Sequence, residues 1–171
     1  MLSLPKRKHP RLKEFDYGQA GCYHITICTD KNMPLLSKIK VGRGLAPAVA
    51  LTAIGEICEE QLLNLENRYL FVRIDKYIIM PTHIHAIIIF KNQSAGASPR
   101  PTLTDIVCTF KSLSTRLCNQ QNGIQGRKIF QTSFYDEVIR NEKVYQEIWQ
   151  YINENPMKWA EDEYYRGSKN F

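Results

Sequence analysis

The stretch from Met80 to Phe90 reads MPTHIHAIIIF, and it decides how the chain is expected to fold. Its β-branched and aromatic residues are typical of a strand, in which successive side chains point to opposite faces of the sheet. His83 and His85 therefore project from one face, whereas Ile84 projects from the other. The residues that follow are apolar on both faces, so we expect this strand to lie centrally in its sheet.

Two imidazoles on one face of a strand can share a metal ion, but the pattern also has a simpler interpretation. Buried histidines need hydrogen-bond partners for their ring nitrogens, and two satisfied core histidines would show the same spacing. His83 and His85 alone do not make a metal site, because two ligands leave the coordination incomplete. Any further ligands have to come from another part of the chain.

Strand and helix patterns alternate on either side of this segment. Period-two alternation and β-branched or aromatic runs predict strands, and apolar residues at helical spacing predict helices. The expected elements are a strand at Tyr23 to Cys28, a helix from Thr52 to about Asn64, strands at Tyr69 to Met80 and His83 to Phe90, a helix opening at Thr102 and Thr104, a strand or irregular aromatic segment over 129 to 139, and a helix from Asn141 to about Asn155.

The resulting order, β-α-β-β-α-β-α, predicts an α+β fold. It matches a ferredoxin-like split βαβ arrangement with an antiparallel sheet and one additional C-terminal helix. The 171 residues are enough for one core and too few for two, so we expect residues 1–171 to form a single domain.

Four segments have no strand or helix pattern. Residues 1–15 carry five cations and two prolines and are expected to form an extended basic arm. Residues 31–48 contain glycines and prolines typical of a loop, and residues 91–101 are expected to form a flexible surface loop. Residues 160–171 form a basic and aromatic C-terminal tail.

The composition favours a polyanionic partner. Lysine and arginine number 23 against 17 acidic residues, which gives a formal net charge of +6 and a pI near 9.1. The five cysteines include no CxxC pair, and no apolar stretch approaches the roughly 20 residues of a membrane span. The N-terminus lacks a signal-peptide pattern, so we expect a cytoplasmic protein with reduced cysteines.

The last predicted helix places a phenol and a carboxamide on one face. Tyr151 and Asn155 are four residues apart in YINENP, and residues at this spacing are neighbours on a helix. Together with His83 and His85 they would supply an oxygen ligand, two nitrogen ligands and a nucleophile for metal-assisted chemistry on a phosphate.

At this point the chain resembles a known family, the REP-associated tyrosine transposases within the single-tyrosine HUH transposases. HUH denotes histidine, hydrophobe, histidine, which is His83-Ile84-His85 here. The resemblance covers most of the chain. Its motifs, in order, are RLKEFDY at Arg11 to Tyr17, YHITICT at Tyr23 to Thr29, MPTHIH at Met80 to His85, FYDEVIR at Phe134 to Arg140, and YINENPMKW at Tyr151 to Trp159.

The resemblance implies cleavage and rejoining of single-stranded DNA by transesterification. Tyr151, on the C-terminal helix, would attack a backbone phosphate and form a 5′-phosphotyrosine link. His83, His85 and Asn155 would hold Mg²⁺ or Mn²⁺, although this family often has glutamine where Asn155 stands. A phenol of ordinary pKa, about 10, is a poor nucleophile at neutral pH, so a cation is expected to offset the developing charge.

The resemblance implies that the substrate is a hairpin-bearing single strand, such as a repeated extragenic palindrome (REP), in the prokaryotic nucleoid. Phosphate contacts and base stacking would use cationic and aromatic residues. Whether the protein acts as a monomer or a homodimer stays open. The candidate DNA-binding residues are Arg7, Lys8, Arg11, Lys13, Lys111, Arg140 and Lys158.

Alternatives remain for the nucleophile and for the function. Tyr135 competes with Tyr151, whereas Tyr145 lies off the Tyr151 face of the helix. The alternative functions are a domesticated hairpin-DNA-binding protein with little or no catalysis, and a metal-dependent hydrolase of small phosphates in which Tyr151 is structural.

Overall fold

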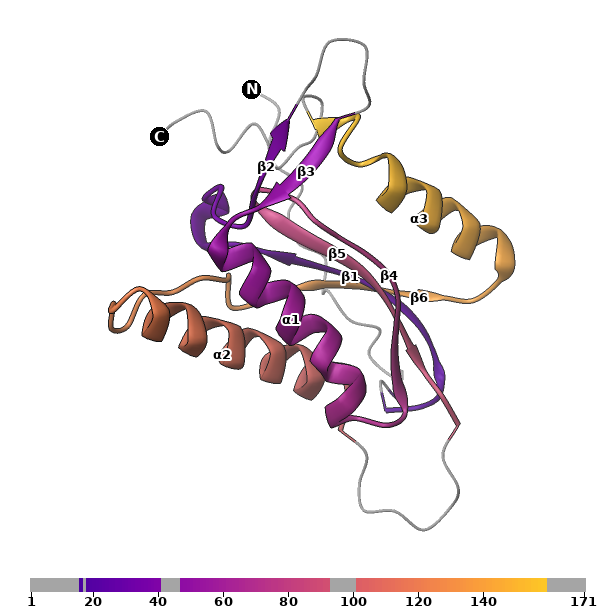
Figure 1. Ribbon diagram of the computed structural model, residues 1–171. Helices are drawn as coiled ribbons and strands as arrows, with labels where there is room; N and C mark the ends of the chain where they lie inside the picture. The colour runs from indigo at the N-terminus through magenta and orange to yellow at the C-terminus, as the bar shows by residue number, and fades with distance from the viewer. Residues whose placement is uncertain (1–15, 17, 41–46, 93–100, 160–171) are drawn as a thin grey trace, which may run out of the picture.

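The core of the protein is one four-stranded antiparallel sheet (Figure 1), seen in a computed structural model that describes residues 16, 18–40, 47–92 and 101–159. The strands lie in the spatial order β4-β5-β1-β6, and each neighbouring pair is antiparallel. This order is that of a split βαβ fold, so the predicted fold class is confirmed. The strands are β1 (Gly21–Cys28), β4 (Val72–Ile79), β5 (His83–Phe90) and β6 (Tyr135–Ile139).

Three helices cover the two faces of this sheet. α1 (Ala53–Arg68) and α2 (Leu103–Gln121) lie together on one face, and α3 (Glu142–Glu154) lies on the other (Figure 1). Each helix begins after a polar residue whose side chain accepts a hydrogen bond from a backbone N–H of the first turn. These capping residues are Thr52, Thr102 and Asn141.

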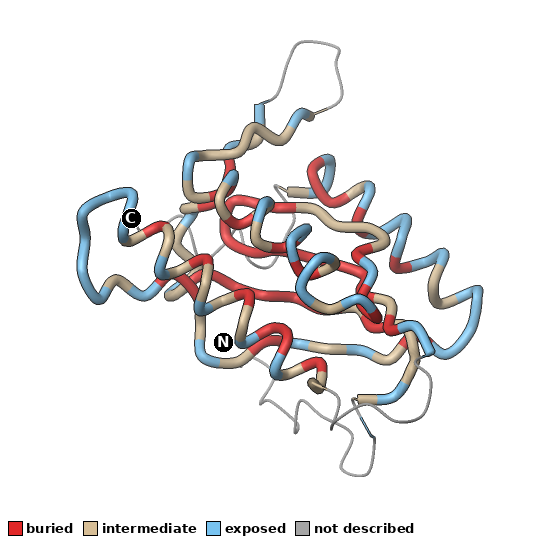
Figure 2. The backbone as a smooth tube through the Cα atoms, turned by 60° about the horizontal axis from the view of Figure 1, so that its bottom comes forward, coloured by how far each residue is buried: buried red, intermediate tan, exposed pale blue. Residues whose placement is uncertain are grey.

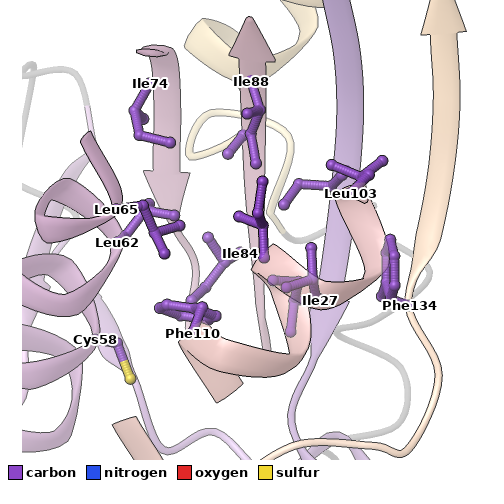
Figure 3. Close-up of a cluster of buried hydrophobic side chains, with 14 of the residues drawn as sticks. Ile27, Cys58, Leu62, Leu65, Ile74, Ile84, Ile88, Leu103, Phe110 and Phe134 are labelled. Atoms are coloured by element: carbon purple, nitrogen blue, oxygen red, sulfur yellow. The ribbon is translucent and has the colours of Figure 1, made fainter. Parts of the chain in front are cut away.

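The larger hydrophobic core lies between the sheet and the α1–α2 pair. Ile84 and Ile88 of β5 and Ile27 of β1 face Phe110 of α2 and Leu62 of α1 (Figure 3). The central strands are buried along most of their length (Figure 2). A smaller cluster joins α3 to the opposite face and consists of Ile87, Ile139, Ile148 and Ile152.

The prediction of a loop over residues 31–48 is wrong in part. Ser37–Lys40 forms β2 and Ala48–Leu51 forms β3, which pair with each other as a separate antiparallel ribbon. Each strand has four residues, too few for a clear period-two pattern beside glycines and prolines. The hydroxyl of Thr52 donates to the carbonyls of Leu35 and Leu36, which ties the ribbon to the start of α1.

The aromatic segment over 129 to 139 is only partly a strand. β6 begins at Tyr135, and before it Phe130 makes a single bridge to Thr29. The expected arm at 1–15, most of the loop at 91–101 and the tail at 160–171 lie outside the described residues. In the described part of the chain, no helix has the length and apolar character that crossing a membrane requires.

Candidate functional site

The histidine pair lies on the face of β5 that turns toward α3. Ile84 and Ala86 belong to the core on the opposite face, so the predicted alternation is confirmed. The rings of His83 and His85 have centroids 4.6 Å apart, and both side chains are buried. The strand register therefore brings two imidazoles together beneath the last helix.

Two residues of β1 surround His85. Thr26 pairs directly with His85 in the β1–β5 ladder, and its Oγ1 lies 2.9 Å from His85 Nδ1. His24 lies two residues earlier on the same face, with its Nε2 3.3 Å from the same nitrogen. The His24 and His85 rings are stacked, with centroids 5.3 Å apart.

Tyr151 approaches the histidines from α3. Its hydroxyl lies 3.3 Å from His85 Nε2, and the two rings meet edge to face with centroids 5.1 Å apart. The residue is 41% exposed, whereas His85 is buried. The phenol thus reaches the imidazole site while remaining accessible from solvent.

Asn155 follows the last residue of α3 and keeps helical backbone angles, so it stays one turn beyond Tyr151 on the same face. It is only 2% exposed, and its Oδ1 is buried without a well-formed hydrogen bond to any described residue. Its side chain nevertheless interacts with His83. A buried amide oxygen in this state is available to a cation.

His83 is held from two further sides. The hydroxyl of Thr82 lies 3.1 Å from His83 Nδ1, and the ring of Trp159 lies 6.0 Å from the His83 ring. Between α3 and Trp159 the chain forms further turns, in which the amides of Met157 and Lys158 donate to the Glu154 carbonyl. The residues after the helix therefore close one side of the site.

The imidazoles are uncharged at neutral pH. Burial lowers the pKa of His24 to about 4. Burial lowers the pKa of His83 to about 3, against the opposing effect of the neighbouring Asn155 side chain. The pKa of His85 falls well below its usual value through burial first and then through His83 and His24. Neutral imidazole is the form that binds metals.

The donor set fits a divalent cation. In the described part of the chain, no three or more His, Cys, Asp or Glu side chains are grouped to hold a metal. Asn155 supplies an amide oxygen beside the two neutral histidines. Two nitrogens and one oxygen suit Mn²⁺ and leave positions for substrate oxygens.

The competing tyrosines differ in their surroundings. The Tyr145 hydroxyl donates to the carboxylate of Asp75, and this bond first and burial second raise the pKa of Tyr145 to about 12. Tyr145 therefore points to β4 and away from the histidines. Tyr135 is 41% exposed on β6 and pairs with Thr26, so its side chain is on the same sheet face as His85.

Three of the predicted DNA-binding residues are described, and they lie apart from one another. Lys111 is on α2, where its Nζ donates to the Thr132 carbonyl at 2.8 Å. Arg140 is exposed between β6 and α3. Lys158 pairs with Glu154 at 2.6 Å, just beyond Asn155. The remaining candidates, Arg7, Lys8, Arg11 and Lys13, lie outside the described residues.

The sequence interpretation did not assign His24, Thr26 or Trp159 to the site. The alternation of the first strand carried a signal for His24 and Thr26, since both fall on its polar face opposite Tyr23 and Ile25. Nothing local to Trp159 indicates that its ring lies beside His83.

A cation–π contact joins β4 to α3, where Lys76 Nζ lies 4.1 Å from the centroid of the Trp149 ring.

Comparisons with known proteins show what the chain is similar to. No protein-family model matches the chain. An uncharacterised protein of Haemophilus influenzae is 31% identical over 174 residues, and the match covers 93% of both chains. A solved structure of a REP-associated tyrosine transposase bound to a REP hairpin matches with a TM-score of 0.62 at 18% identity, over 88% of this chain and 74% of the other. The fold implied by the sequence resemblance is thus confirmed.

Proposed function

We propose that this chain, which belongs to one family with the Haemophilus influenzae protein and has the fold of a REP-associated tyrosine transposase, cleaves and rejoins single-stranded DNA. One observation carries the proposal. An exposed tyrosine hydroxyl on α3 lies 3.3 Å from the second histidine of a buried HxH pair, with a buried amide oxygen one helical turn further on.

In the proposed reaction, Tyr151 Oη forms an ester bond to a backbone phosphorus, and the bond from phosphorus to the 3′-oxygen breaks. The phenol loses its proton and the departing 3′-oxygen gains one, so the products are a 5′-phosphotyrosine and a free 3′-hydroxyl. The phosphotyrosine ester retains the energy of the phosphodiester bond that was broken. Attack by another 3′-hydroxyl therefore rejoins strands without a nucleotide cofactor. Tyr151 is accessible enough to receive a strand from solvent.

His83, His85 and Asn155 would hold the divalent cation, Mg²⁺ or Mn²⁺. When bound, such a cation neutralises charge that develops on the phosphoryl oxygens. The chain's own residues arrange the rest: burial keeps both imidazoles neutral, and α3 holds the phenol beside them. The ring of Trp159 lies beside His83, with the two ring centroids 6.0 Å apart.

The proposed substrate is a hairpin-bearing single strand. The neighbouring solved structure is a transposase bound to a REP hairpin, and the net charge of +6 favours a nucleic acid over a small anionic substrate. Lys111, Arg140 and Lys158 are the described candidates for backbone contacts, and the basic residues of the first fifteen add others.

The test is covalent capture of a labelled hairpin oligonucleotide in Mn²⁺, resolved on a denaturing gel. We expect a shifted band from the native protein, no band from Tyr151→Phe, and a loss of at least 10²-fold from His83→Ala. Tyr135→Phe is the matched control, because it removes a hydroxyl of equal exposure from the same sheet face and should leave the band intact.

Other outcomes assign the function differently. A band that survives Tyr151→Phe but disappears in Tyr135→Phe makes Tyr135 the nucleophile. A tight complex on a native gel, with no covalent band for any hairpin, supports the hairpin-binding protein instead. Steady turnover of a small phosphate ester by Tyr151→Phe supports the hydrolase.

A further inference from the structure

Each histidine of the pair has a threonine hydroxyl at the same ring nitrogen. Thr82 Oγ1 lies 3.1 Å from His83 Nδ1, and Thr26 Oγ1 lies 2.9 Å from His85 Nδ1. The two threonines come from different parts of the chain, one from the residue before β5 and the other from β1. The contact between a threonine hydroxyl and a histidine Nδ1 therefore occurs twice, and each time the threonine comes from a different local structure.

We propose that Thr26 and Thr82 are positioning residues that keep the proton of each imidazole on Nδ1, so that His83 and His85 both present an unprotonated Nε2 to the site beneath α3. A neutral imidazole carries one proton, and the hydrogen bond made by one nitrogen decides which nitrogen stays available. In metal sites this outer contact sets both the tautomer and the orientation of the ring.

With its proton on Nδ1, His85 has hydrogen-bond partners at both ring nitrogens. A protonated Nδ1 finds two acceptors, Thr26 Oγ1 at 2.9 Å and His24 Nε2 at 3.3 Å. His85 Nε2 then turns its lone pair toward the Tyr151 hydroxyl, 3.3 Å away. The opposite tautomer would place the proton on Nε2, where it would block a cation.

The threonines are suited to fixing the rings because they cannot easily move. Thr82 is fully buried and Thr26 is 6% exposed. A β-branched side chain has a restricted χ1 torsion, so its hydroxyl stays in one place. Thr26 is also locked opposite His85 by the β1–β5 register. The rings are consequently oriented before any ligand arrives.

The inference rests on the proposed function only for the cation that the Nε2 atoms would receive. The tautomers belong to the metal-free chain and can be measured there. Long-range ¹H–¹⁵N NMR of histidine-labelled, metal-free protein distinguishes a protonated from an unprotonated ring nitrogen at each position. We expect the proton on Nδ1 of both His83 and His85.

Substitutions can distinguish a threonine that positions the imidazole through its hydroxyl from one that only fills space. Thr26→Val keeps the shape of the side chain but removes its oxygen, so we expect a mixed tautomer at His85 and a Mn²⁺ affinity about 10-fold to 100-fold weaker by EPR titration. Thr26→Ser restores the oxygen and should restore both the single tautomer at His85 and the Mn²⁺ affinity. Thr82→Val should act on His83 in the same way.

Thr109→Val is the matched control, since the Thr109 hydroxyl bonds to Tyr69 and to the Asp105 carbonyl on the other side of the sheet. It should change neither the tautomers nor the Mn²⁺ affinity. A proton on His85 Nε2 in the native protein overturns the inference, as does a Thr26→Val protein with unchanged tautomer and affinity. If the native protein shows the expected tautomers but binds no Mn²⁺ and forms no adduct, the proposed function fails and the positioning role stands.

Discussion

The two faces of β1 and β5 are made by the same strands but differ completely in character. Toward α1 and α2, these strands present Ile25, Ile27, Ile84 and Ile88 to a continuous apolar core. Toward α3, the same strands present histidines and Thr26 at one end and apolar residues at the other. Side-chain alternation allows one sheet to carry a core and a polar site back to back.

Neighbouring residues of each strand point to opposite faces, so residues of the stabilising core alternate along the strand with residues of the candidate site. His83 and His85 can be buried without partners from the main core, because their hydrogen bonds come from Thr26 and His24 on the same face and from Thr82 just before β5. Changes on the α1–α2 face should therefore lower stability most, and changes to the histidines and their threonine partners should alter activity and the pH dependence of stability.

The largest effect on stability is expected from the core face. Phe110 is almost fully buried on α2, so Phe110→Ala should lower the free energy of unfolding by about 3–5 kcal/mol, measured by urea denaturation. Leu63→Ala is the control, because Leu63 is 42% exposed on α1. Equal losses from the two variants would contradict the assignment of the main core to this face.

Acid should destabilise the protein through the polar face. In the folded protein the pKa of His24 is about 4 and that of His83 about 3, below the 6.5 of an unfolded histidine. The unfolded chain binds more protons between these values, so stability falls as pH drops below about 6.5 and levels off near the folded pKa values. His24 alone should contribute on the order of 3 kcal/mol.

The measurement is the free energy of unfolding from pH 7.5 to pH 4. His24→Gln should flatten the curve within that window, since glutamine does not titrate. A curve of unchanged steepness would mean that His24 is protonated equally easily in both states.

A smaller loss is expected where α3 is fastened to β4. Tyr145→Phe removes the hydrogen bond to Asp75 and should cost about 1.5–3 kcal/mol, the range for bonds to charged groups. Covalent capture of DNA should persist, because Tyr145 points away from the histidines. Loss of capture in a folded Tyr145→Phe protein would show that this bond also sets the position of Tyr151.

The smallest effect tests whether DNA reaches the α2 side of the sheet. Lys111→Gln should weaken single-stranded DNA binding slightly and lower the salt slope by about one, if Lys111 contacts one phosphate. Lys143→Gln is the comparison on the α3 side, where Lys143 lies 3.9 Å from Glu147 on the exposed surface of the helix. An unchanged slope in Lys111→Gln would confine the DNA to the α3 face.

Much of the fold could be predicted because the decisive elements have strong local patterns. The alternation in Tyr23 to Cys28 and His83 to Phe90 predicts both strands and their polar faces, and the helical spacing of Tyr151 and Asn155 survives in the structure. The β2–β3 ribbon was missed because its short strands depend on pairing with each other, which no local pattern records.

The site was predicted less completely than the fold. His83, His85, Tyr151 and Asn155 do come together, and their roles remain predictions. The residues that surround these four come from parts of the chain that are distant in the sequence or that have no regular pattern. Thr26 reaches His85 through strand register, and Trp159 lies beside His83 after the turns that follow α3.

The placement of Tyr151 and Asn155 on one helix has a mechanical consequence. Because both residues follow one helical backbone, the spacing between the phenol and the amide is fixed by α3 alone. Their distance from the imidazoles on β5 is set separately, by the packing of Ile148 and Ile152 of α3 against the sheet.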